Sequence, residues 1–371
     1  MSRAERPVLL VGGVPGNTAE EVYQTVAPIL GDLAIGLTDG ETGLRRMWVF
    51  YVFTRTWLNH PDLEVTKRVQ SPPPEFPPWI PKELHEWIPV NYDDFPWVAV
   101  RQGVAELSPI ETLGYPAEAK ASYDIFCRLR HEGVIPEGVR FQQSLPFPDD
   151  AVRLFAGTAA DMAIMVDAYV DVMQRDVAEV CRLIPHDDLV LQWDVNWETI
   201  ALEYGDHLPG VAPMQFKPHG DAMQRYRHYL LELNAGIPDQ VGVGLHLCYG
   251  DMHHKHFKDP NDLSTSVNMT NEAVAVSPRS IDFVQMSVPR HRDDDAFFEP
   301  LRDLRTDNTT IYAGLIHYTD GVEGSIKRLQ AFKRYYDGPA GVSTECGLGR
   351  RPADQDLIKL LQIHHDVAAA I

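Results

Sequence analysis

Three residues whose side chains bind soft metal ions stand out in this sequence of 371 residues. His246 and Cys248 are spaced as His-x-Cys, and in an extended strand both side chains point to the same side. Cys346 follows much later, within Thr-Glu-Cys-Gly-Leu. Imidazole and thiolate groups suit zinc, and three protein ligands leave a fourth position open for a substrate. Taken alone the pair is a weak signal, because a buried cysteine is commonly just a small apolar side chain.

Short apolar segments alternate along the chain with longer amphipathic segments. Nearly continuous apolar runs such as Leu189–Asp194 are typical of parallel strands that are buried on both faces. Eight strands with intervening helices predict an α/β fold, a single (βα)8 TIM barrel formed by residues 1–371. A doubly wound sheet is the alternative, but no G-x-G-x-x-G motif follows the first strand. The predicted strands are Val8–Gly12, Ala34–Thr38, Val139–Leu145, Leu189–Asp194, Val241–His246, Asp282–Ser287, Thr310–His317 and Gly341–Thr344.

In a parallel barrel, active-site residues lie at the C-terminal ends of the strands. The predicted strand ends bring the His-x-Cys pair and Cys346 to one mouth of the barrel, together with two carboxylates, Glu41 and Asp194. These carboxylates could bind a cationic group, or they could orient other side chains. His317 could act as a general acid near neutral pH, with a hydrogen-bonded structural histidine as the alternative. Arg350 could bind an anionic substrate group, since guanidinium groups suit bidentate contacts to oxyanions.

The connection between the second and third predicted strands is unusually long and contains a Pro- and Trp-rich stretch. Residues 53–136 include SPPPEFPPWIPKELHEWIPVNYDDFPW, which has too many aromatic residues for a disordered linker. We expect this insertion to pack over one end of the barrel, either as a lid or as an oligomer contact. A folded insertion without a direct catalytic role is the alternative.

The charge and composition exclude several classes of partner. The formal net charge of −20 argues against a surface that binds nucleic acid or an anionic membrane. No uncharged apolar run is long enough for a transmembrane helix, and no secretory signal is evident, so a cytoplasmic protein is expected. Four cysteines, irregularly spaced, do not indicate a disulfide framework. The expected partners are therefore small molecules, with a homo-oligomer left open.

Five short motifs occur along the chain, and they carry a family resemblance. They are Val11-Gly12-Gly13-Val14-Pro15, Asp39-Gly40-Glu41, Gln192-Trp193-Asp194, Leu245-His246-Leu247-Cys248-Tyr249 and Thr344-Glu345-Cys346-Gly347-Leu348. They resemble, in the same order, the (I/V)GSFP, HGE, QIDEP, HxCY and DCGL segments of the catalytic barrel of cobalamin-independent methionine synthase and its shorter single-barrel relatives. Each motif is short, but the ordered set is specific and spans nearly the whole chain.

The resemblance implies a zinc ion held by His246, Cys248 and Cys346. It also implies that Gly12, Gly13, Glu41 and Asp194 help to hold an amino-acid substrate, with Asp194 at the amino group. His317 falls where the family has a proton-donating histidine. The implied reaction is the zinc-dependent transfer of a methyl or other alkyl group from an alkyl donor to a small-molecule thiol.

Three departures from the family pattern leave the reaction open. Ser287 stands where the acidic zinc ligand is expected, so Glu345, Asp251 or water could supply the fourth ligand. The Trp that stacks on folate is not evident around residues 145–148, and this sequence contains one barrel rather than two. The alternatives are thiol alkylation like that of epoxyalkane:coenzyme M transferase, and a lyase or hydrolase acting on a carboxylated aromatic compound at the same barrel rim.

Overall fold

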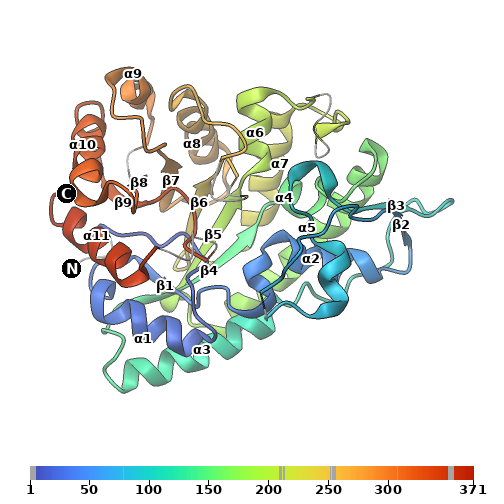
Figure 1. The fold of residues 1–371 in the computed structure, drawn as a ribbon, viewed down its shortest axis with the longest axis horizontal. Coiled ribbons are helices and arrows are strands. Elements are labelled where there is room, and N and C mark those ends of the chain that lie inside the picture. Colours follow the sequence, from blue (N-terminus) through green and yellow to red (C-terminus); the bar gives the residue numbers. More distant parts are fainter. Residues whose placement is uncertain are drawn as a thin grey trace.

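The centre of the molecule is a curled, barrel-like sheet of seven parallel strands in the order β1-β4-β5-β6-β7-β8-β9 (Figure 1). The computed structural model describes residues 6–77, 79–208, 211, 214–250, 252, 256–306, 308–349 and 355–371. The strands are β1 (Gly36–Thr38), β4 (Arg140–Pro146), β5 (Leu189–Val195), β6 (Gly242–Leu247), β7 (Phe283–Ser287), β8 (Thr310–Ile316) and β9 (Ala340–Thr344). The last seven of the eight predicted strands therefore occur in the structure, in the predicted order.

The first predicted strand, Val8–Gly12, is present only as two isolated parallel bridges. Val8 forms one bridge to Ala34 beside β1 and another to Val342 on β9. The amide of Val8 donates to the carbonyl of Leu33 at 3.0 Å, and the amide of Leu9 donates to that of Val342 at 3.0 Å. The segment thus lies between the two edges of the sheet, where it satisfies backbone groups that an open edge would leave unpaired.

Helices cover the outer face of the sheet (Figure 1). The longer helices are α1 (Ala19–Leu30), α3 (Tyr115–His131), α5 (Ala159–Leu183), α7 (Ala222–Asn234), α8 (Ser264–Val276), α10 (Gly321–Lys333) and α11 (Leu357–Ala368). The shorter ones are α2 (Val49–Arg55), α4 (Pro148–Val152), α6 (Trp197–Tyr204) and α9 (Asp295–Phe298). Their starts follow local chemistry: the side chain of Thr18 accepts from the amide of Glu21 at the start of α1, and Asp221 with Gln224 forms a capping box on α7.

Buried glutamines cross-link the interior of the sheet beneath its C-terminal end. Gln142 on β4 donates to the carbonyl of Leu10 at 2.7 Å, and Gln192 on β5 donates to the carbonyl of Val11 at 2.8 Å. Both side chains are almost completely buried. Because buried polar groups need partners, these contacts fix the segment around Val11 against β4 and β5.

The segment 53–136 contains a small antiparallel sheet that the sequence did not predict. It consists of β2 (Leu63–Lys67) and β3 (Trp97–Val100), which lie at the end of the molecule opposite the two chain termini (Figure 1). The same segment ends in α3, which packs against α1 and α5 in the outer layer. The part between α2 and α3 is therefore the portion that departs from the regular alternation of strands and helices.

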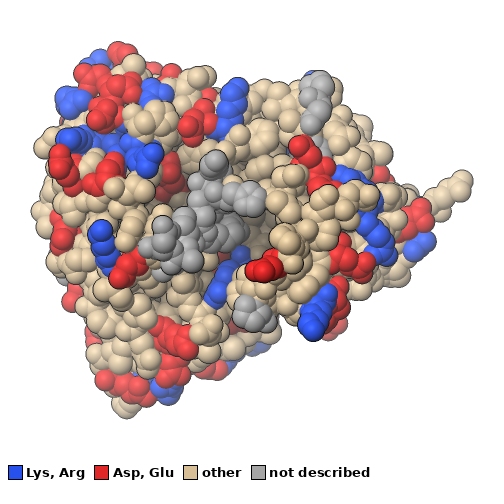
Figure 2. Space-filling view, viewed as in Figure 1, with Lys and Arg blue, Asp and Glu red and all other residues tan. Residues whose placement is uncertain are grey.

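Charged side chains of both signs are interspersed over the face shown in Figure 2, and no broad basic area is visible there. This agrees with the acidic composition of the chain. Within the described residues, no helix combines the length and the apolar character that crossing a membrane requires.

Candidate metal centre and the adjoining cavity

Three neighbouring strands place polar side chains in one row at the C-terminal end of the sheet. Asp194 on β5 is in register with His246 on β6, which is in register with Gln285 on β7. Residues paired in a parallel sheet point to the same face, so all three side chains enter the interior. Cys248 follows directly after β6, and Cys346 follows β9.

The side chains of His246, Cys248 and Cys346 form a cluster that fits a zinc ion. One ligand atom from each residue lies within 4.8 Å of the others, and the two Sγ atoms are 3.8 Å apart. Tetrahedral zinc with zinc–sulfur bonds of about 2.3 Å separates two sulfur ligands by roughly 3.8 Å. The Nε2 atom of His246 is buried and has no hydrogen-bond partner among the described residues, as expected of a nitrogen that binds metal. No fourth His, Cys, Asp or Glu of the described residues joins the cluster.

Gln285 orients the histidine of this cluster. Its Nε2 donates to the carbonyl of Thr344 at 3.0 Å, which leaves its Oε1 to accept from the Nδ1–H of His246 at 2.5 Å. This bond places the proton on Nδ1 and leaves the lone pair of Nε2 for a metal. Gly314 on β8 provides the space, because a Cβ there would lie 2.3 Å from the Gln285 amide nitrogen.

Ser287 does not take the place of an acidic ligand. Its hydroxyl lies 2.8 Å from the carbonyl oxygen of Glu345 and 3.1 Å from that of Leu247. It therefore ties together the two segments that carry Cys248 and Cys346. The side chain of β7 that reaches the cluster is Gln285, two residues earlier on the same face of the strand.

Replacing Gln285 with leucine should weaken zinc binding by about 10- to 100-fold, because the orienting partner of a metal-binding histidine is lost. Competition against a chromophoric chelator measures this change. Gln142→Leu is the matched control, since it removes a buried glutamine that bonds to Leu10 and Gln192 rather than to the cluster. Equal zinc affinity in the two variants would contradict the role given to Gln285.

In the absence of metal, the imidazole of His246 interacts closely with Cys346. Burial alone would lower the pKa of His246, but Cys346, the charge of Asp194 and the bond to Gln285 raise this pKa to about 9. The surroundings therefore favour a positive charge at the centre of the cluster. A divalent cation would satisfy the same preference.

A buried ion pair shapes the turn that carries Glu41. Arg45 donates to both carboxylate oxygens of Asp39, at 3.0 and 2.7 Å, and Ser122 donates to Asp39 at 2.6 Å. Asp39 also accepts from the backbone amide of Glu41 at 2.9 Å. Glu41 has a φ of 52°, a left-handed conformation that few non-glycine residues adopt. Arg45 is thus engaged within the turn, and the turn sets the position of Glu41.

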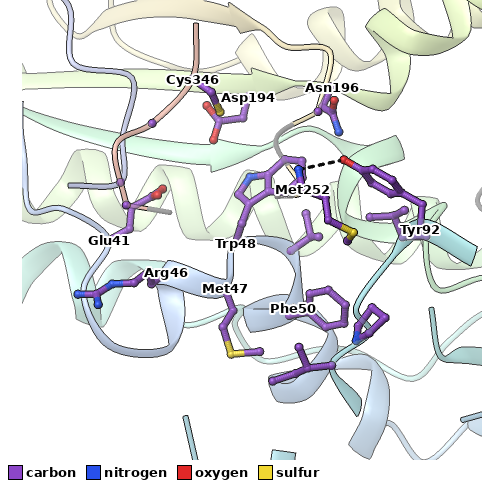
Figure 3. Close-up of a pocket in the computed structure, with 18 of the residues that line it drawn as sticks. Glu41, Arg46, Met47, Trp48, Phe50, Tyr92, Asp194, Asn196, Met252 and Cys346 are labelled. Atoms are coloured by element: carbon purple, nitrogen blue, oxygen red, sulfur yellow. Dashed lines mark hydrogen bonds between the residues drawn. The ribbon is translucent and has the colours of Figure 1, made fainter. Parts of the chain in front are cut away.

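The carboxylate of Glu41 lies against Gly12 and Gly13. A Cβ at Gly13 would lie 3.1 Å from Oε2 of Glu41, and one at Gly12 would lie 3.5 Å from the carboxylate. Gly12 also has a φ of 130°, which favours glycine. Glu41, Asp194 and Cys346 meet at one end of the same cavity (Figure 3). The structure thus brings together the predicted substrate-binding residues that it describes.

His317 follows directly after β8 and is outside the described lining of the cavity. Its Nε2 contacts the carbonyl of Val288 at 2.9 Å, and its Nδ1 lies 3.5 Å from Oε2 of Glu345. Burial and the charge of Arg328 lower the pKa of His317 to about 3, so the ring is neutral near neutral pH. Its role as a general acid stays a prediction. Arg350 and Asp251 lie outside the described residues.

The cluster opens onto a cavity of about 520 Å³. This is a typical volume for a small-molecule site. One end carries the three ligand residues with Glu41 and Asp194, and most of the remaining wall is apolar. Much of that wall comes from residues 73–95, within the insertion.

Neither a family model nor a curated protein matches the sequence. Two solved structures match its fold with a TM-score of 0.55 and 12% sequence identity each. One is a B12-independent methionine synthase from Shewanella sp. W3-18-1 in complex with selenomethionine, matched over 98% of this chain and 97% of that chain. The other is a protein from Listeria monocytogenes described as a vitamin B12-independent methionine synthase, matched over 94% and 86%. This chain shares their fold.

The likeness read from the sequence motifs is thereby confirmed at the level of the fold. It extends over nearly the whole chain, as the order of the motifs predicted. Activity does not follow from the fold, because one fold supports many reactions.

Sequence reasoning missed two groups of residues at this site. Gln285 could have been found from the alternation of β7, since Phe283, Gln285 and Ser287 share one face of the strand. The part of the apolar wall that lies outside the insertion carries no comparable signal. Its residues, such as Trp48 and Trp197, belong to no recognisable motif and meet only in the folded chain.

Proposed function

We propose that the protein transfers a methyl or other alkyl group to a thiol at a zinc site formed by His246, Cys248 and Cys346. The observation that carries the proposal is a set of three soft ligand atoms at the spacing of a tetrahedral zinc site, opening onto a cavity. Bound zinc would favour the thiolate form of a thiol near neutral pH. A fourth position facing the cavity is where such a thiol would enter.

The thiol that fits this end of the cavity is an α-amino acid such as homocysteine. Glu41 and Asp194 would hold its ammonium group, and Gly12 and Gly13 allow the ligand to approach the backbone closely. The Shewanella structure contains selenomethionine, the selenium analogue of the thioether that methylation of homocysteine produces. Thiols that lack the ammonium group, such as 2-mercaptoethanesulfonate, are the alternative class.

We infer that the segment around Val8 completes a (βα)8 barrel, because it bridges both edges of the seven-stranded sheet. We also infer that residues within 53–136 serve as a lid, because part of this segment lines the cavity. Such a cover would keep water from a reactive thiolate.

The test is titration of L-homocysteine into the zinc-loaded protein in weak buffer. One-to-one binding with release of a proton is expected, since the thiol binds as thiolate. Glu41→Gln should weaken binding by about 10- to 100-fold, the range for a lost hydrogen bond to a charged group. Zinc content should stay at one ion per chain in this variant.

Glu75→Gln is the matched control, because Glu75 is another carboxylate that lines the same cavity. This variant should bind homocysteine as tightly as the unaltered protein. Binding of 2-mercaptoethanesulfonate but not of homocysteine would support a thiol site at the zinc ion. It would contradict the proposed contact of Glu41 and Asp194 with an ammonium group. If neither thiol binds with proton release, the proposed function is wrong.

A further inference from the structure

Flat aromatic side chains supply a large share of the apolar wall of the cavity. Six of them define what we call the aromatic chamber: Trp48, Phe50, Phe76, Trp79, Tyr92 and Trp197. They come from the segment before α2, from α2, from the insertion and from the start of α6. Segments far apart in the sequence therefore contribute one kind of surface to one space.

The walls of the aromatic chamber are held in place by packing. The rings of Tyr92 and Trp197 meet edge to face, with centroids 5.7 Å apart and an interplanar angle of 84°. Phe95 stacks on Tyr92 and packs against Phe50, with centroid distances of 6.2 and 5.2 Å. The hydroxyl of Tyr92 accepts from the amide of Met252 at 3.4 Å (Figure 3). Such a wall is organised before a ligand arrives, which reduces the entropy lost on binding.

Trp48 adopts a backbone conformation that is unfavourable for its type. Its φ is 54°, in the left-handed region that bulky residues seldom occupy. Figure 3 shows its indole extending from the segment before α2 toward the end of the cavity where Asp194 and Cys346 lie. The strained turn thus presents a large aromatic surface beside the metal cluster.

The wall also contains polar atoms that lack partners. Nε1 of Trp48 and Oδ1 of Asn196 are buried, and neither atom has a hydrogen-bond partner within the part of the chain that the structure describes. Native proteins leave few such atoms unsatisfied, and a ligand is one source of the missing bond. Among the described lining residues, Arg46 is the single Lys or Arg, and its guanidinium already lies over the ring of Trp79 at 4.9 Å.

We propose that the aromatic chamber binds a neutral aromatic compound, the second substrate of the site. Its ring system packs against the aromatic walls, and the substituent that carries the alkyl group faces the cluster of His246, Cys248 and Cys346. As the thiolate sulfur bonds to the alkyl carbon, the bond from that carbon to the oxygen of the aromatic compound would break. The departing oxyanion would take up the proton that the thiol released, so that a thioether and a phenol form. The orientation rests on the proposed function, whereas binding itself requires neither zinc nor a thiol. Offset and edge-to-face contacts with several fixed rings favour planar aromatic ligands over flexible aliphatic ones.

The probe for this proposal is 2-methoxynaphthalene, a neutral, fluorescent aryl methyl ether. Titration should show saturable one-to-one binding to both the zinc-loaded and the zinc-free protein. Trp79→Ala should weaken binding about tenfold, because one aromatic wall is lost. Trp97→Ala is the matched control: Trp97 lies on β3 in the same insertion but outside the lining, and its removal should leave the affinity unchanged.

Val90→Trp is a second variant, which fills the aromatic chamber instead of removing a wall. It should abolish most of the binding of 2-methoxynaphthalene. The proposal is overturned if the probe does not saturate, or if all three variants bind it equally. It is also overturned if 2-naphthalenesulfonate binds much more tightly than the neutral probe. Binding of the probe to a protein that takes up no thiol would reject the proposed function and leave the aromatic site standing.

Discussion

Replacing Cys346 with serine is expected to remove most of the bound zinc. Structural zinc sites bind with about 10–16 kcal/mol, so each of three or four ligands contributes roughly 3–4 kcal/mol, or a several-hundred-fold change in affinity. A serine hydroxyl is a harder and more weakly ionised ligand than a thiolate and does not replace it. The ligand atoms of His246, Cys248 and Cys346 lie within 4.8 Å of one another, so the remaining two residues form only part of the site.

Metal analysis and chelator competition measure this loss without any assay of activity. In the cobalt-substituted protein, the sulfur-to-metal charge-transfer absorption should fall as well. Cys127→Ser is the control, because Cys127 lies on α3 away from the cluster and should not affect metal content. If Cys346→Ser retains one tightly bound zinc per chain, the cluster is not the zinc site.

Breaking the buried ion pair of Asp39 and Arg45 is expected to cause a large loss of stability. Their side chains are only 4% and 5% exposed, and the contact is bidentate. Asp39→Asn leaves the buried guanidinium without its closest counter-charge, and this should lower the free energy of unfolding by about 3–5 kcal/mol. Urea denaturation measures the change. Glu118→Gln removes the weaker partner of Arg45, which is 45% exposed, and should change stability by less than about 1 kcal/mol.

The same pair predicts the direction of an acid effect. Burial alone would raise the pKa of Asp39, but Arg45, Ser122 and the amide of Glu41 hold it below its usual value. A carboxylate with a depressed pKa stabilises the fold above its unfolded pKa of about 3.9 and loses this contribution as the pH falls through the folded value. The difference in the free energy of unfolding between the unaltered protein and Asp39→Asn should therefore be smaller at pH 3 than near neutral pH. A difference that grows on acidification would contradict the ion pair.

The grouping of His246, Cys248 and Cys346 could be predicted from sequence because a local spacing, the order of the strands and the ordered set of motifs all point to it. The His-x-Cys spacing on a strand fixes the relative direction of His246 and Cys248, and the parallel order of the strands brings Cys346 to the same edge. Seven of the eight predicted strands rest on the same kind of local pattern. The segment at Val8 differs because its pairing depends on both edges of the sheet rather than on its own residues.

The contacts between side chains could not be predicted in the same way. The family resemblance drew attention to Ser287, the residue at the position of the expected acidic ligand. The partner that orients His246 is instead Gln285, which reaches it because Gly314 on β8 leaves room. The small sheet of β2 and β3 was missed because Pro-rich flanking sequence obscures two short strands. Both the contact between Gln285 and His246 and the pairing of β2 with β3 depend on residues that are distant in the sequence rather than on local propensity.

The bridges from Val8 to Ala34 and Val342 carry a consequence for biosynthesis. As the ribosome extends the chain, the segment at Val8 can pair with the residues before β1 early, but its other edge stays exposed until β9 has emerged. Cys346 lies two residues after the end of β9. The strand that pairs with Val8 and the third predicted zinc ligand therefore become available almost together. A nascent chain thus acquires this metal-binding geometry only after Cys346 has left the ribosome, which limits premature capture of metal by a partly folded polypeptide.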